Sequence, residues 1–134
     1  MSKAIITVGI AAGAVMAVDL ATKGMARGRD VSLAEHPGDP RLGFLVAGAP
    51  LAAAAGALVV GSRLGASMPM VAAGVTLFVA GGVLNGVELL VRGSNTNPIQ
   101  IRHTAFNVAD LSVVAGVGLI CLGALPVVTR ALAR

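Results

Sequence analysis

Long apolar stretches separated by polar connections form the main pattern along this chain. Four apolar blocks cover residues 4–20, 44–61, 68–91 and 108–127. Each is close to the roughly 20 residues that a helix needs to cross a bilayer. None shows the polar–apolar alternation of a membrane β-strand, so a barrel is not expected. The pattern predicts an all-α integral membrane protein, a four-helix transmembrane bundle that forms a single domain over residues 1–134.

Composition supports a membrane protein. Hydrophobic residues make up 56% of the chain and charged residues 12%, with a mean hydropathy of +0.88, whereas soluble domains have roughly a quarter charged residues. The 18 glycines suit close packing of helices in lipid. The net charge of +4 reflects few acidic residues. Because the chain lacks a dense basic cluster and an aromatic platform, nucleic acid is not an expected partner.

The first apolar block has a second interpretation. Lys3 followed by about 15 apolar residues has the shape of a secretory signal peptide. However, Asp19 and Lys23 follow the apolar residues directly. Their position favours a retained helix whose end carries polar groups.

Charge gives a weak signal on membrane orientation. An even number of spans puts both termini on one side of the membrane. The basic residues on that side are Lys3, Arg63, Arg130 and Arg134, and those on the other side are Lys23, Arg27, Arg29, Arg41, Arg92 and Arg102. The positive-inside rule therefore weakly places the termini outside the cytoplasm.

Polar residues recur in pairs near one end of three predicted helices. The pairs are Asp19 with Lys23, Asn85 with Glu88, and Asn107 with Asp110. Spacings of three and four residues put both members of a pair on one helix face. An ionised group in hydrocarbon costs roughly 2.5–3.5 kcal/mol even on the lenient insertion scale. The pairs predict one polar pocket that opens to one membrane face.

Hydrogen bonding between helices is the simpler explanation for polar residues in a membrane, at about 0.6 kcal/mol per bond. Three of these six residues are carboxylates, namely Asp19, Glu88 and Asp110. Carboxylates that converge in a membrane protein favour a functional site.

Four segments, in order along nearly the whole chain, carry a resemblance to a known family. They are Asp19 to Lys23, Asp39 to Phe44, Gly81 to Glu88, and Phe106 to Asp110. The last, Phe-Asn-Val-Ala-Asp, matches the fourth-helix motif of signal peptidase II, the lipoprotein signal peptidase. The first resembles the family's Asp and Lys four residues apart, and the third resembles its third-helix Gly-Gly segment. The second is similar to a family loop that has Asn where this chain has Asp39.

The resemblance implies a membrane aspartic endopeptidase that removes signal peptides from lipid-modified prolipoproteins. It also implies a bacterial cytoplasmic (inner) membrane location, with both termini in the cytoplasm. Asp110 matches one catalytic residue of the family. The pocket-organising or substrate-binding residues would be Asp19, Lys23, Asp39, Asn85 and Asn107.

The second catalytic position departs from the family. There, a second catalytic Asp lies twelve residues after the third-helix Asn, and the same count from Asn85 gives Asn97. An aspartyl protease shares one proton between two carboxylates, one of which activates water. An amide cannot take that proton. Glu88, which stands where the family has Asp, is the candidate substitute partner for Asp110, and Asp39 is a more remote candidate from a loop.

Three function classes stay open. The first is an active endopeptidase in which Glu88 or Asn97 completes the site with Asp110. The second is a catalytically impaired member that binds lipidated or transmembrane peptides without cleaving them. The third is an ion pathway, which a small bundle without internal repeats makes less attractive.

The expected partners are the lipid-modified prolipoprotein or another transmembrane peptide, together with membrane lipids, and a monomer is expected. No cofactor is expected. No metal site is expected either, because His36 and His103 lie in separate loops without ligand spacing. The lone Cys121 excludes an internal disulfide.

Overall fold

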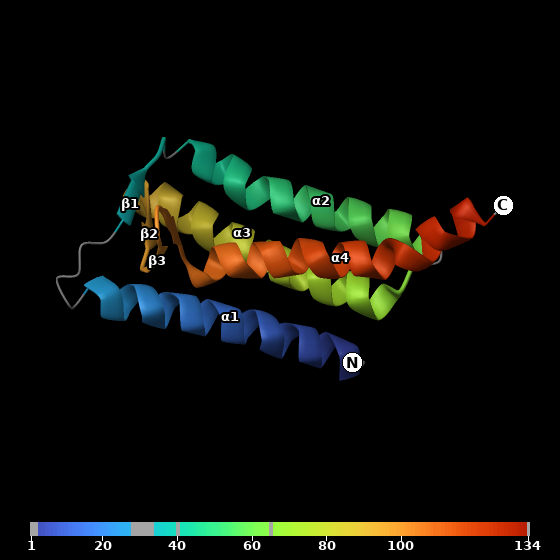
Figure 1. Cartoon of the computed structure of the whole chain (residues 1–134). Coiled ribbons are helices and arrows are strands. Elements are labelled where there is room, and N and C mark those ends of the chain that lie inside the picture. The colour runs from blue at the N-terminus through green and yellow to red at the C-terminus, as the bar shows by residue number, and fades with distance from the viewer. Residues whose placement is uncertain (1–2, 28–33, 40, 65, 134) are drawn as a thin grey trace.

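Four helices lie side by side in the computed structural model, which describes residues 3–27, 34–39, 41–64 and 66–133 (Figure 1). They are α1 (Lys3–Arg27), α2 (Leu42–Leu64), α3 (Met68–Arg92) and α4 (Val108–Leu132). Among the described helices, α2, α3 and α4 are long and apolar enough to cross a membrane. The chain is therefore a multi-pass membrane protein. The predicted span 4–20 is helical within α1 but is not one of these three.

Two small antiparallel sheets lie at one end of the helices (Figure 1). The strands are β1 (Ala34–Pro37), β2 (Ser94–Asn97), β3 (Ile99–Ile101) and β4 (Thr104–Phe106). Strand β1 pairs with β2, and β3 pairs with β4. The all-α expectation is thus corrected to a mostly helical fold with short strands in two connections. Backbone groups need partners where the chain folds back over the helices, and strand pairing provides them.

Helix α3 lies between α2 and α4 and approaches both backbones closely. A Cβ atom added at Gly81 would lie 2.3 Å from the Ala109 carbonyl oxygen of α4. One added at Gly86 would lie 2.6 Å from the Ala47 backbone nitrogen of α2. Glycine is the only residue that allows this spacing, as is usual where helices pack in lipid.

Helix α1 is packed more loosely along its apolar part. A cavity of about 380 Å³ lies between α1 and α3, and its lining includes Met16, Val79 and Val83. Closer to the strands, α1 reaches α3 and α4 through polar side chains. The contact of α1 with the other helices is therefore apolar along the helix and polar near the strands.

Gly93 ends α3 and returns the chain over it. Its φ of 69° is left-handed, and its N–H donates to the Leu89 carbonyl at 2.9 Å. A residue with a side chain would be strained in this conformation. The turn leads directly into β2, which places Thr96 and Asn97 beside the end of α3.

Candidate functional site

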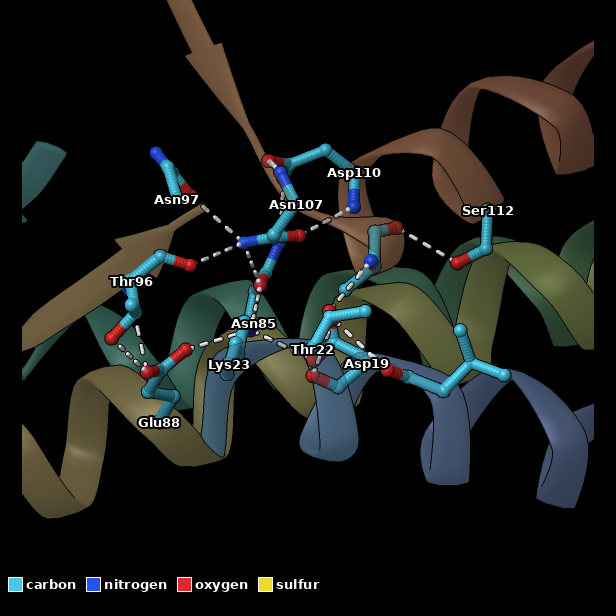
Figure 2. Close-up of polar contacts among 12 residues, drawn as sticks. Asp19, Thr22, Lys23, Asn85, Glu88, Thr96, Asn97, Asn107, Asp110 and Ser112 are labelled. Carbon is cyan, nitrogen blue, oxygen red and sulfur yellow. Dashed lines mark hydrogen bonds and ion pairs between the residues drawn. The ribbon is translucent and has the colours of Figure 1, made fainter. Parts of the chain in front are cut away.

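A cluster of polar side chains lies where α1, α3, β2 and the start of α4 meet (Figure 2). We call it the polar cluster, and its members are Asp19, Lys23, Arg27, Asn85, Glu88, Thr96, Asn97, Asn107 and Asp110. Most of them are buried. The structure thus brings the three predicted polar pairs together with Asn97.

The start of α4 is held by a capping box. The Asn107 Oδ1 accepts a hydrogen bond from the Asp110 backbone N–H at 2.8 Å, and the Asp110 Oδ2 accepts one from the Asn107 N–H at 3.0 Å. Asp19 completes this end, because its Oδ1 accepts from the Ala109 N–H at 3.0 Å. These bonds satisfy backbone N–H groups that a helix start leaves free, and the positive end of the helix favours carboxylates.

Asp110 is held in one orientation by amides. Its Oδ1 accepts from the Asn85 Nδ2 at 2.7 Å, and its Oδ2 accepts from the Asn107 backbone. Asn107 is completely buried, whereas Asp110 is partly exposed. The Asp110 carboxylate is therefore held in one orientation while the residue remains partly exposed at the surface.

Asn97 reaches the same part of the cluster from β2. Its Oδ1 accepts from the Asn107 Nδ2 at 2.9 Å, and that nitrogen also lies 3.1 Å from the Asn85 Oδ1. Figure 2 shows Asn97 and Asp110 on either side of the Asn107 side chain. Asn97 and Asp110 thus share Asn107 as a hydrogen-bonding partner, Asn97 through the Asn107 side-chain amide and Asp110 through the Asn107 backbone N–H.

Glu88 is engaged by two cations and a threonine. Its Oε1 accepts from Arg27 and from the Thr96 hydroxyl, the latter at 2.7 Å. Its Oε2 lies 2.7 Å from the Lys23 Nζ. Both carboxylate oxygens are therefore occupied by contacts that hold α1, α3 and β2 together.

Lys23 is a buried ammonium with three oxygen neighbours. Its Nζ lies 2.8 Å from Asp19 Oδ2 and 2.7 Å from Glu88 Oε2, and it donates to Asn85 Oδ1 at 3.4 Å. Two carboxylates thus face Lys23, and Glu88 also pairs with Arg27. Asp110 is the third carboxylate of the polar cluster. Its hydrogen bonds within the described residues come from amide groups, not from cations.

Two members of the cluster were not singled out by the sequence. Arg27 lies four residues after Lys23, so it continues the face that starts at Asp19, and this spacing was a usable signal. Its guanidinium contacts Glu88 and the Thr96 hydroxyl. For Thr96 no such signal exists, because its contact with Glu88 depends on the turn after α3.

Asp39 lies in the turn before α2. It is exposed, and its Oδ1 accepts from the Arg41 backbone N–H at 2.9 Å. This bond shapes the entry into the helix in the manner of an Asx-turn. The structure places Asp39 with this turn and not among the hydrogen-bonded members of the polar cluster that it describes.

A cavity of about 160 Å³ adjoins the charged part of the cluster, between α1 and α3. Its lining combines the charged residues of both helices with apolar side chains, among them Leu84, Val87 and Val91. The site therefore offers ionic groups next to an apolar surface, as a ligand with polar and apolar parts requires.

A comparison with protein families matches residues 21–125 to the model described as signal peptidase (SPase) II. The matched range covers most of the chain and includes every member of the polar cluster except Asp19. Comparisons with curated proteins and with solved structures give no match.

Proposed function

The chain belongs to the signal peptidase II family, and we propose that it binds the signal peptides of lipid-modified lipoprotein precursors within a membrane. We propose further that hydrolysis at its site is strongly weakened. The observation that carries this proposal is the contact of Asn107 with both Asp110 and Asn97. In this proposal, Asp110 and Asn97 correspond to the family's two catalytic positions, so the pair consists of one carboxylate and one amide.

The chemistry of peptide hydrolysis explains the weakening. In a carboxylate pair, one group takes a proton from water while the other gives a proton to the carbonyl. Asn97 can donate a hydrogen bond to a peptide carbonyl but cannot accept a proton from water. Asp110 with Asn97 is therefore suited to hold a peptide bond, and general acid–base assistance of about 10²–10⁴-fold is lost.

Glu88 is assigned a structural role in this proposal. Protonation of Glu88 during a catalytic cycle would leave Arg27 without its carboxylate partner and Lys23 with Asp19 alone. An uncompensated buried charge is strongly unfavourable. A carboxylate in that position is poorly suited to exchange protons with water, which supports Asp110 as the group that meets the substrate.

An active peptidase is the second candidate function. The observation that favours it is the partial exposure of Asp110 among buried neighbours, because a catalytic carboxylate has to be reached by water and substrate. In that case Glu88 or Asn97 would complete the site.

For the architecture, we propose that α1 is a fourth span and that the chain is one monomeric domain. The 25 residues of α1 give a helix of about 37 Å, which exceeds the roughly 30 Å hydrocarbon core. The charges near its end are compensated within the polar cluster. The family resemblance favours a bacterial inner membrane location with the termini in the cytoplasm.

The test uses the purified full chain in lipid nanodiscs and a synthetic precursor peptide with and without its lipid. We expect tighter binding of the lipidated peptide and slow cleavage. Asp110→Asn should remove the residual cleavage and retain binding. Asp39→Asn is the matched control, because it makes the same chemical change at an exposed turn.

Two outcomes decide against parts of the proposal. Equal binding of lipidated and unlipidated peptides would exclude the proposed ligand class. Rapid cleavage by the wild type that is lost in Asp110→Asn would replace the binding role with the active peptidase.

A further inference from the structure

We propose that the end of the helices opposite the polar cluster binds one anionic phospholipid. In this proposal Arg63 and Arg130 hold the phosphate, and an apolar cavity beside them holds part of an acyl chain. The site is separate from the polar cluster, and the proposal does not depend on whether the protein cleaves or only binds a precursor.

Two arginines from different helices line one cavity. Arg63 lies in the last turn of α2, and Arg130 lies in the last turn of α4. Both are exposed, and together with Leu64, Val127 and Ala131 they line a cavity of about 280 Å³. Because α2 and α4 both have the length and hydropathy of membrane spans, this cavity lies at headgroup depth.

A second cavity adjoins the first. It has a volume of about 290 Å³ and an apolar lining, and Leu64 and Val127 belong to both cavities. Its deeper part is lined by residues such as Val71, Ile120 and Ala124. A ligand that fits both cavities has an anionic group joined to a hydrocarbon chain, which is the chemistry of a phospholipid.

The charge around the arginines favours an anion. The sequence has no acidic residue between Asp39 and Glu88 and none after Asp110, so the C-terminal parts of α2 and α4 contain no carboxylate side chain. No ion pair of either arginine occurs among the described residues. The C-terminal end of each helix attracts its own arginine, but this does not relieve repulsion between two guanidinium groups that share a cavity. A phosphate would do so, since guanidinium groups bind phosphate in a bidentate manner.

The experiment measures lipid retention by native mass spectrometry of the detergent-solubilised full chain. The probes are dioleoyl-phosphatidylglycerol, dioleoyl-phosphatidylcholine and soluble glycerol 3-phosphate. We expect one phosphatidylglycerol to bind more tightly than phosphatidylcholine, and glycerol 3-phosphate to bind far more weakly than either lipid. A basic side chain near a membrane surface contributes about 1 kcal/mol, so Arg63→Gln and Arg130→Gln should each weaken phosphatidylglycerol binding about fivefold.

Two further variants separate charge from fit. Ala124→Phe fills the apolar cavity without changing charge, and it should also weaken phosphatidylglycerol binding. Arg41→Gln removes an exposed arginine at the other end of the helices and should leave binding unchanged.

Three results would overturn the proposal. They are equal retention of phosphatidylglycerol and phosphatidylcholine, glycerol 3-phosphate binding as tight as that of the lipid, and unchanged retention in the Arg63→Gln/Arg130→Gln double variant. The lipid comparison uses the wild type alone, so it stands even if a variant folds poorly.

Discussion

The Asp19 carboxylate of α1 accepts a hydrogen bond from the Ala109 backbone N–H in the first turn of α4, at 3.0 Å. Its other oxygen lies 2.8 Å from the Lys23 Nζ. One buried side chain therefore serves as a cap for a distant helix and as a counter-ion for its own. The relationship explains how a carboxylate is accommodated in this buried position between two helices.

Asp19→Ala is expected to destabilise the protein more than it affects the site's chemistry. The change removes a cap and leaves Lys23 with one carboxylate fewer, and breaking a buried pair typically costs about 3–5 kcal/mol. Thermal unfolding in detergent should show the loss. Thr22→Ala is the control, because the Thr22 hydroxyl bonds to carbonyls of its own helix. A stable Asp19→Ala protein that no longer binds or cleaves precursor would contradict the structural role.

Glu88→Gln should likewise act through stability. A neutral amide at this position keeps the shape but leaves Lys23 and Arg27 under-compensated, so the yield of folded protein should fall. Activity per folded molecule should change little. Comparison with Glu88→Ala, which also removes the contact with Thr96, should show a larger loss. If Glu88→Gln folds normally and loses all cleavage, Glu88 is the catalytic partner of Asp110.

Asn97→Asp should raise turnover on a lipid-modified precursor. The change restores a second carboxylate near Asp110, and acid–base assistance is worth about 10²–10⁴-fold. The pair works with one shared proton, so the gained activity should be highest where one carboxyl is protonated and should fall as pH rises and both ionise. Asn95→Asp, on the same strand, is the matched control. An unchanged rate in a well-folded Asn97→Asp protein would argue against a degraded catalytic pair.

Gly81→Ala should weaken the packing of α3 against α4. The added Cβ would lie 2.3 Å from the Ala109 carbonyl oxygen and 2.4 Å from the Ser112 Oγ, and overpacking typically costs about 1–3 kcal/mol. The start of α4 should shift, so precursor binding should fall together with thermal stability. Gly118→Ala provides the comparison, since nothing lies within 4 Å of a Cβ there. Equal stability of the two variants would show that the helices separate easily at Gly81.

Reporter tags at the two termini should lie on the same side of the membrane. Figure 1 places N and C at the end opposite the strands, and the proposed fourth span in α1 requires this result. A tag in the β3–β4 turn, at Arg102 and His103, should report the other side. Termini on opposite sides would show that α1 is not a span.

Much of the helical framework could be predicted from the sequence. Each apolar block lies within a helix, because continuous hydrophobic residues in lipid leave the helix as the only way to satisfy the backbone. The meeting of Asp19, Glu88 and Asp110 in one cluster could also be predicted, since all three lie near the same end of their helices. Their individual partners could not, because a spacing fixes the face of a helix and not which neighbouring group it meets.

The strand region was beyond sequence reasoning. Strands of three or four residues are too short to give a periodic signal, and β1 pairs with β2 across about sixty residues. The position of Asn97 depends on the left-handed turn at Gly93. The sequence does not show that the chain folds back over α3 at this glycine. Asn97 was singled out by counting twelve residues from Asn85, as the resemblance to the family suggests. Its hydrogen bond with Asn107 became known only from the structure.

The apolar cavity between α1 and α3 has a consequence for assembly. Helix α3 contacts the backbones of α2 and α4 closely at its glycines, whereas the described side-chain bonds of α1 to the rest of the protein are those of Asp19, Lys23 and Arg27. The described contacts thus distinguish a three-helix unit from a first helix that joins it through polar side chains. Two separately made fragments, divided after α1, should therefore associate in a bilayer through these ion pairs.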